Sequence, residues 1–424
     1  MATSGTQRAR TAPAPRLGPR PLPLHLMAAA LAWTGSRAAW PLLKNGSLPW
    51  RPQVRARAAA LESQLENVDP EAFEHALDAA SRVRWRALVD GILAYRHHPY
   101  RRDLADPPTV WHEGTTRLLD YGATSPSSRD GAPVLFVPSL VNRAYILDLA
   151  ADTSLMRWLA GRGARPFLVD WDRPGPVERD FTLTDYIAGR LEGALDAARA
   201  ASGRRPVVVG YCMGGLLALA LAQRRPGDIA GLGLLATPWD FHTDGGGQGA
   251  LAASALFALG PLMELMGELP LDAVQALFAN LDPQLVPRKF LAFGRLDPAS
   301  PKAARFVALE DWLNDGVPLA APVARECLGG WYAKNAPALG QWRVAGSPVD
   351  PGRLRMPCLN VIPGQDRIVP PASARVLAQA IPGAAALEPT IGHIGMMVSA
   401  HARAQVWQPL ADWLTKIAAP RASR

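Results

Sequence analysis

The chain has 424 residues, of which 49% are hydrophobic and 19% are charged. This composition is typical of a globular protein with a large core, and it excludes a mostly disordered chain. The 37 glycines and 40 prolines are too few, and too irregularly spaced, for a low-complexity or collagen-like protein. No run of about 18 uninterrupted apolar residues is present, so we expect no transmembrane helix.

The formal net charge of +8 is concentrated at the N-terminus. Residues 1–60 hold nine Lys and Arg and no Asp or Glu, which leaves 36 basic and 37 acidic residues in the rest of the chain. A nucleic-acid-binding protein usually spreads a basic face over its folded domain. The distribution therefore argues against nucleic acid as a partner and fits a basic arm that touches an anionic surface.

Two segments precede the part of the chain that carries the motifs. Residues 1–24 are rich in Arg and Pro and are expected to form a disordered leader. The apolar run from Leu22 to Trp33 lacks a clear cleavage site and continues into alanine-rich sequence, which favours a helix over an export signal. Residues 25–110 are predicted to be a helical extension, because apolar residues recur at near-helical spacing between Gln53 and His97.

Short apolar strands then alternate with longer helical segments. The predicted strands are Val134–Pro138, Pro166–Val169, Val207–Gly210, Gly231–Ala236 and Cys358–Ile362. Helices are predicted between them, for example at Leu183–Ala201 and Gly214–Gln223. Such alternation predicts an α/β fold with a mostly parallel sheet and helices on both faces.

The alternation lapses for more than 100 residues between Pro238 and Met356. That span is helical in pattern at Leu251–Met266, Leu271–Leu281 and Phe306–Leu313. We therefore expect residues 111–238 and 357–424 to form the α/β core. Residues 239–356 are expected to form an inserted cap over the ends of its strands.

The clearest chemical signal is the segment Gly210-Tyr211-Cys212-Met213-Gly214-Gly215. A β-branched strand runs directly into it, and an Ala/Leu-rich helix follows. This is the pattern of the nucleophile elbow of α/β hydrolases, with Cys212 in place of serine. The helix N-terminus would favour the thiolate and direct backbone N–H groups at an oxyanion. A buried structural cysteine is the competing interpretation, but it would not require the flanking glycines.

In this fold the acid and the histidine follow the nucleophile along the chain. Asp366 stands in the loop after the last predicted strand, where the orienting acid belongs, although a loop Asp can also simply make a turn. His393 lies between two glycines further along, whereas His401 sits in a helical segment. We predict His393 as general base and Asp366 as the residue that fixes its tautomer.

Backbone N–H groups should bind the oxyanion. One is expected at Met213, and the other in the loop after Val134–Pro138, at Leu140 or Val141, between which the sequence does not decide. The other two cysteines, Cys327 and Cys358, are expected to be packing residues, since their spacing fits neither a zinc site nor a disulfide framework. This cysteine usage is typical of a reducing compartment.

Further residues carry weaker signals. His97-His98 is interpreted as a surface pair rather than a metal site. No metal or cofactor is expected.

The chain resembles the polyhydroxyalkanoate synthases, a family within the α/β-hydrolase superfamily. The resemblance covers about residues 115–410. It is carried by the segment Val137 to Leu149, the Gly-Tyr-Cys-Met-Gly-Gly box, Trp312 with Asp315, Gly364–Pro370 and Gly392-His393-Ile394. Two positions depart from the usual family pattern: Asp172-Arg173 follows Trp171, and Arg367 follows the acid.

The resemblance implies synthesis of polyester from 3-hydroxyacyl-CoA by a Cys-His-Asp triad, with the roles falling on Cys212, His393 and Asp366. It also implies a cytoplasmic enzyme that contacts the polyester chain or granule surface, and it leaves self-association open. The alternative enzyme is a cysteine-dependent hydrolase: a thioesterase, a polyester depolymerase or a dienelactone-hydrolase-like protein. A third interpretation is a non-catalytic protein of the granule surface.

Overall fold

The computed structural model describes residues 16–243 and 245–418. They belong to two compact units, which are treated separately. The first contains the N-terminal residues up to Arg101 together with Asp282–Asn314, and the second contains Arg102–Leu281 and Asp315 onwards. Most of the predicted leader, residues 1–15, lies outside the described residues.

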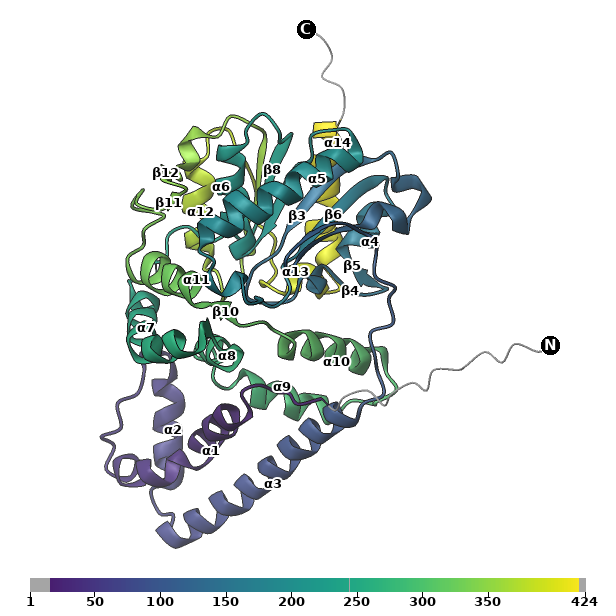
Figure 1. Cartoon of the computed structure of the whole chain (residues 1–424). Helices are drawn as coiled ribbons and strands as arrows, with labels where there is room; N and C mark the ends of the chain where they lie inside the picture. Colours follow the sequence, from purple (N-terminus) through teal and green to yellow (C-terminus); the bar gives the residue numbers. More distant parts are fainter. Residues whose placement is uncertain (1–15, 244, 419–424) are drawn as a thin grey trace, which may run out of the picture. The chain divides into compact units, whose positions relative to one another are not determined.

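The first unit is helical (Figure 1). Its helices are α1 (Leu22–Lys44), α2 (Arg55–Leu65), α3 (Pro70–His97), α9 (Leu285–Phe293) and α10 (Pro301–Asn314). Helices α3 and α9 approach so closely that a Cβ at Gly91 would lie 2.2 Å from the Phe290 carbonyl oxygen. The apolar side chains between these helices form a core of their own, around Trp33, Tyr95 and Phe290.

This unit differs from the predicted segments in two respects. Residues 282–314 pack with the N-terminal helices, although the sequence placed them in one cap with residues 239–281. Arg16 was assigned to the disordered leader, yet its guanidinium donates to the Asp311 carboxylate at 2.6 Å, and α1 begins at Leu22. Helical periodicity identifies these helices but does not say which neighbour covers their apolar faces.

The second unit is built on an eight-stranded sheet with the order β1-β2-β6-β3-β7-β8-β13-β14. Its strands are β1 (Thr109–Glu113), β2 (Thr116–Asp120), β3 (Ala132–Val137), β6 (Ala164–Asp170), β7 (Val207–Tyr211), β8 (Gly231–Leu235), β13 (Cys358–Val361) and β14 (Ala385–Leu387). In this order the strands from β6 to β14 run parallel to one another, whereas β2 pairs antiparallel with both of its neighbours, β1 and β6. The predicted fold class and all five predicted strands are therefore confirmed, and β1, β2 and β14 are additions.

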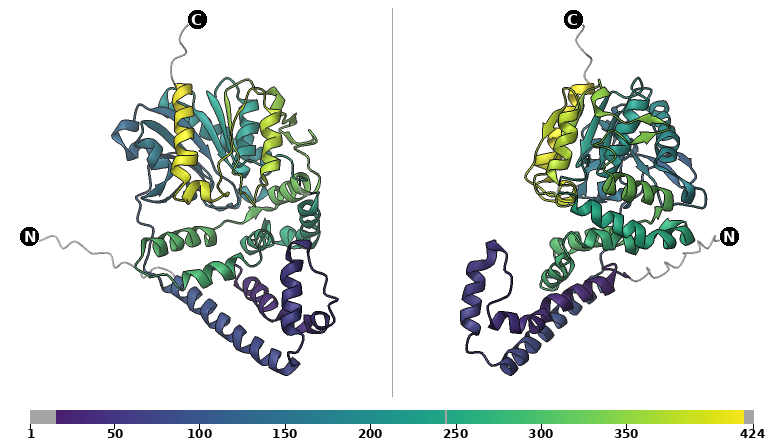
Figure 2. Two further views of the ribbon diagram at one scale, coloured as in Figure 1. Left: turned by 180° about the vertical axis from the view of Figure 1, so that it is seen from behind. Right: turned by 90° about the vertical axis from the view of Figure 1, so that its left-hand side faces the viewer.

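Helices cover both faces of this sheet. Helices α5 (Glu192–Ser202) and α6 (Met213–Arg224) lie on the face seen in Figure 1, and α14 (Gln408–Ala418) lies on the opposite face, seen in Figure 2. The remaining helices of the core are α4 (Leu155–Ala160), α12 (Pro371–Ala380) and α13 (Gly395–Val398). The core between these layers is almost fully buried, as expected for parallel strands covered on both sides.

Between β8 and β13, the second unit carries helices α7 (Gly247–Met266), α8 (Leu271–Ala279) and α11 (Ala321–Arg325). A π-helical segment, Glu326–Ala333, continues α11, and short ladders join β9 (Glu268–Leu269) to β10 (Leu319–Ala320) and β11 (Arg343–Val344) to β12 (Ser347–Pro348). By length and composition alone, α7 is apolar enough to cross a membrane, with a mean hydropathy of 1.5. The sequence did not predict this, because α7 includes small and polar residues that interrupt its apolar run.

Asp148 anchors the loop region after β3. It belongs to β4 (Asp148–Ala150), which pairs with β5 (Thr153–Ser154), and it is fully buried. Its carboxylate accepts hydrogen bonds from Arg102 at 2.9 Å, Arg157 at 2.8 Å and the Tyr121 hydroxyl at 3.0 Å. The three donors compensate for the cost of removing this carboxylate from water. Removing its charge would leave two arginines without their shared partner.

We expect Asp148→Asn to lower the free energy of unfolding by roughly 3–5 kcal/mol, the cost of breaking a buried ion pair. Urea unfolding followed by circular dichroism measures the change. Asp130→Asn, at an exposed position, is the matched control and should leave the transition in place. An unchanged transition in Asp148→Asn would show that the loop does not depend on this charge.

Candidate active site

Cys212 lies at the turn between β7 and α6. Its backbone has φ 56° and ψ −127°, a conformation that residues with a side chain rarely adopt. The Cys212 N–H donates to the Leu235 carbonyl oxygen at 2.8 Å, which ties the turn to the end of β8. The thiol remains half-buried, so this turn keeps it accessible at the carboxyl end of the central strands.

The glycines around Cys212 are required by close backbone contacts. A Cβ at Gly210 would lie 2.4 Å from the Gly215 Cα. A Cβ at Gly214 would lie 2.1 Å from the Val137 carbonyl oxygen, and one at Gly215 would lie 1.8 Å from the Thr237 Oγ1. No side chain fits at these distances, so the elbow predicted from the glycine pattern is present for the predicted steric reason.

Asp366 follows β13, in the loop before α12. Its Oδ1 accepts the backbone N–H groups of Ile368 at 2.8 Å and Val369 at 2.9 Å. Its Oδ2 is 2.6 Å from His393 Nδ1, and the carboxylate is buried. Because two fixed donors hold the first oxygen, the second is oriented toward the imidazole.

His393 lies in the loop between β14 and α13, and its side chain is buried. The Tyr211 ring lies against the imidazole, with ring centres 5.2 Å apart, and the Tyr211 hydroxyl donates to the His393 carbonyl oxygen at 3.3 Å. The bond from Nδ1 to Asp366 leaves Nε2 for Cys212. The structure therefore brings together Cys212, Asp366 and His393, which are far apart in the sequence.

The charge of His393 depends on its two neighbours. Burial lowers its pKa, but the negative charge of Cys212, the hydrogen bonds to Asp366 and Cys212, and the charge of Asp366 together raise the pKa to about 10. At neutral pH the imidazole therefore carries a positive charge beside Cys212. A cationic neighbour activates a cysteine nucleophile.

Three backbone N–H groups were predicted as candidates for the oxyanion site. Those of Met213, the first residue of α6, and of Leu140, in the loop after β3, have no hydrogen-bond partner within the described residues. The Val141 N–H, the other candidate in that loop, donates to Ser139 Oγ at 3.1 Å. Of the three predicted donors, Met213 and Leu140 therefore remain free.

Three aromatic or polar residues at the site were not predicted from the sequence. They are Tyr211, Tyr332 and Thr237. Burial raises the pKa of Tyr332, and the charge of Cys212 adds to the shift. Tyr332 comes from the π-helical segment and packs against Phe241, with ring centres 4.7 Å apart. Only Tyr211, which stands next to Cys212, carried a signal in the sequence.

The other two cysteines and the His97-His98 pair are not part of the contacts among Cys212, His393 and Asp366. Cys327 and Cys358 are buried, and burial raises the pKa of both thiols, that of Cys358 to about 12. His98 is buried rather than at the surface as predicted, because its Nε2 is 2.8 Å from the Pro298 carbonyl oxygen. Within residues 16–243 and 245–418, no group of three His, Cys, Asp or Glu could hold a metal ion.

A match to a family model agrees with this fold. Residues 132–400 match the alpha/beta hydrolase fold family, and residues 104–159 match the N-terminus of poly-beta-hydroxybutyrate polymerase (PhaC). Similar solved structures include a hydrolase from Pseudomonas aeruginosa, which is 17% identical. The match covers 72% of this chain and 94% of that chain, with a TM-score of 0.45. Another is a putative non-heme bromoperoxidase from Mycobacterium tuberculosis, at 16% identity, 76% of this chain, 100% of that chain and a TM-score of 0.46.

Several curated relatives bear one name, "Poly(3-hydroxyalkanoate) polymerase subunit PhaC". The protein from Haloferax mediterranei is 29% identical over 72% of this chain and 63% of its own length, so about a third of that relative has no counterpart here. The proteins from Allochromatium vinosum and Synechocystis are each 30% identical over 67% of this chain, and over 81% and 78% of their own lengths. The chain belongs to the poly(3-hydroxyalkanoate) polymerase subunit PhaC family, within the α/β-hydrolase fold.

Proposed function

We propose that this protein is an acyltransferase that joins 3-hydroxyacyl groups from CoA thioesters into a polyester, through an acyl-enzyme on Cys212. The observation that carries the proposal is the 2.6 Å contact between His393 and Asp366 beside an elbow cysteine. Family membership supports the polyester product, since the relatives are named polymerase subunits.

In the first step the Cys212 thiolate attacks the carbonyl carbon of the 3-hydroxyacyl thioester. The carbon–sulfur bond to CoA breaks, and the leaving CoA thiolate takes a proton from the His393 imidazolium. One thioester replaces another, so the step is close to isoenergetic and needs no activating cofactor. The N–H groups of Met213 and Leu140 would bind the oxyanion of the tetrahedral intermediate. Leu140 is proposed rather than Val141 because the Val141 N–H already donates to Ser139 Oγ.

In the second step a 3-hydroxyl group attacks the acyl carbon on Cys212. Acylation removes the thiolate charge that raised the pKa of His393, so the lowering of this pKa by burial is less opposed. The neutral imidazole can then accept the hydroxyl proton. The new carbon–oxygen bond forms, the carbon–sulfur bond breaks, and the thiolate returns beside the protonated imidazole. Asp366 would keep Nδ1–H in place throughout both steps.

Chain growth requires that water does not reach the acyl-enzyme, since water would release the free acid. Tyr332 lies close enough to Cys212 to be affected by its charge and packs against Phe241, so this aromatic pair would supply an apolar shield. The substrate is a water-soluble CoA thioester and the product an apolar polyester. This favours an enzyme that works in the cytoplasm at the granule surface.

Incubation with 3-hydroxybutyryl-CoA should place an acyl adduct on Cys212, detected by intact-mass spectrometry and peptide mapping. Cys212→Ala should lose the adduct, whereas Cys358→Ala, the matched control, should keep it. Polymer with free CoA is the expected product. Free 3-hydroxybutyrate without polymer would indicate the hydrolase instead, and an adduct on Cys327 or Cys358 would overturn the assignment of the nucleophile.

Removing the base or its orienting acid should slow turnover while the fold persists. We expect His393→Ala and Asp366→Ala to reduce the rate of CoA release by roughly 10²–10⁴-fold, as for loss of a general base. His401→Ala, at an exposed position, is the matched control and should retain full activity. Near-native turnover in His393→Ala, with circular dichroism unchanged, would remove this residue from the mechanism.

The pH dependence of Cys212 acylation should report the charge of His393. Below its pKa of about 10 the imidazolium can protonate the leaving CoA. The single-turnover rate should therefore stay constant at mildly alkaline pH and fall near pH 10. Asp366→Asn removes a charge that favours the imidazolium and should shift this fall to lower pH. An alkaline limb at the same pH in both proteins would show that Asp366 does not tune His393.

A further inference from the structure

A second hollow of the α/β unit lies at the opposite end of the sheet from Cys212. It is a groove of about 1170 Å³ at the amino ends of β7, β8 and β13. Arg205, Ile229 and Pro357, which precede these strands, all line it. A five-residue strand is roughly 17 Å long, so the groove is separate from the catalytic residues at the carboxyl ends.

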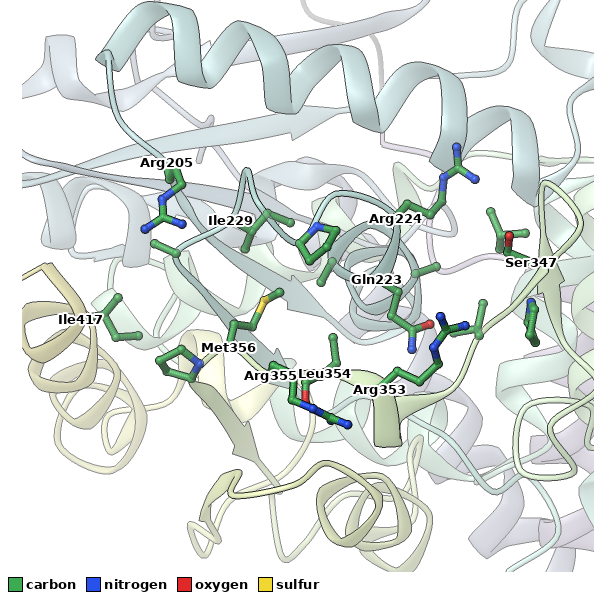
Figure 3. A pocket seen from close by; sticks show the side chains of 18 of the residues that line it. Arg205, Gln223, Arg224, Ile229, Ser347, Arg353, Leu354, Arg355, Met356 and Ile417 are labelled. Carbon is green, nitrogen blue, oxygen red and sulfur yellow. The ribbon is translucent and has the colours of Figure 1, made fainter.

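The rim of this groove is basic. Its lining includes five basic side chains and no acidic one: Arg205, Arg224, Arg353, Arg355 and Lys416. Figure 3 shows Arg205 on one side and Arg353 and Arg355 on the other, with Ile229 and Met356 between them.

Most of this positive charge has no counter-charge. Only Arg224 is paired, with Glu192 at 2.7 Å. Arg355 donates to the backbone carbonyl oxygens of Gly352 and Leu354 at 2.7 and 2.8 Å. Within the described part of the chain, Arg205, Arg353 and Lys416 form no ion pair.

Asp350, close to Arg353 in the sequence, forms no ion pair with the described residues of the groove. Asp350 directs its side chain to the Gly352 N–H at 2.9 Å, and its backbone carbonyl accepts from Gln223. By contrast, many arginines elsewhere in this unit pair with carboxylates, for example Arg117, Arg165 and Arg375. Four uncompensated positive charges around one hollow therefore point to an anionic ligand.

The floor of the groove is apolar and fixed. It is formed by Ile229, Leu354, Met356 and Ile417. Ile417 and Trp413 of α14 pack so closely beneath β8 that a Cβ at Gly231 would lie 2.8 Å from the Ile417 Cδ1. The groove is thus built on rigid elements and combines an apolar surface with guanidinium groups, which suit phosphate oxygens geometrically.

We propose that this groove binds a phosphate-rich anion of nucleotide size, with its phosphates on the arginine rim and its remaining part on the apolar floor. The volume exceeds what one phosphate needs and suits a ligand with several phosphate groups. Nucleic acid fits less well, because the chain beyond residue 60 is nearly neutral and the charge is confined to one hollow. The proposal is independent of the polyester chemistry at Cys212.

The test measures binding of ATP, coenzyme A and inorganic triphosphate to the full-length protein by isothermal titration calorimetry at low and high salt. Arg353→Gln/Lys416→Gln removes two rim charges that make no hydrogen bond to the fold. Arg129→Gln/Arg204→Gln removes two exposed charges outside the groove and is the matched control. We expect the groove variant to lose at least roughly tenfold in affinity for triphosphate and ATP, and the control to bind like the wild type.

Hydrogen exchange should show protection of residues 352–357 and 413–417 on binding. High salt should weaken the binding, because it screens the rim charges. Tighter binding of ATP than of triphosphate would identify a nucleotide as the ligand, whereas equal binding would identify the phosphates alone. Equal losses in both variants, or no binding of any of the three at millimolar concentration, would overturn the proposal. So would binding of poly-glutamate without binding of triphosphate, which would indicate an acidic protein partner.

Discussion

The backbone at Cys212 imposes a constraint on most of the α/β unit. A non-glycine residue held at φ 56° costs on the order of 1–3 kcal/mol and persists only where its surroundings fix it. Here β3 and β8 lie on either side of β7, and the Leu235 carbonyl accepts the Cys212 N–H. Gly214 contacts the end of β3, and Gly215 contacts Thr237. The position of the half-buried thiol therefore depends on the packing of three strands and one helix, not on the turn alone.

A second constraint acts on the loop that supplies the other free backbone donor. Leu140 lies between the end of β3 and the buried Asp148, whose carboxylate binds Arg102, Arg157 and Tyr121. Those bonds fix the far end of the segment, and the Trp171 indole donates to the Pro138 carbonyl oxygen at 3.1 Å near its beginning. The segment through which the chain resembles its family is thus held at both ends, which fixes the position of the Leu140 N–H.

The parts that the sequence predicted correctly are those with a local cause. The elbow follows from glycines within three residues of Cys212, and the central strands follow from short apolar runs. The meeting of Asp366 with His393 was predictable because loops after parallel strands meet at one edge of the sheet. The hydrogen bond from the Val141 N–H to Ser139 Oγ, which distinguishes Val141 from Leu140, was not predictable because it depends on how the Ser139 side chain turns.

Features that depend on distant partners were beyond the sequence. The buried His98 contacts the Pro298 carbonyl oxygen, which lies about two hundred residues away in the chain. Residues 282–314 have the same helical periodicity as the segments around them, yet they pack with α3. Strand β14 has three residues and β1 is mostly exposed, so neither has the apolar run by which strands are recognised.

Burial at the active site has two opposite effects on His393. On its own, removal from water disfavours the imidazolium and lowers its pKa. The same low dielectric strengthens the attraction of the nearby Cys212 thiolate and Asp366 carboxylate. While the thiolate is present, the attraction outweighs burial and the pKa of His393 is raised. When acylation removes that charge, the lowering effect of burial is less opposed. Water in the site would weaken both effects and would also attack the thioester. Under the proposed mechanism, the exclusion of water by Tyr332 and its partner Phe241 would therefore serve the change of His393 from acid to base as well as the survival of the acyl-enzyme.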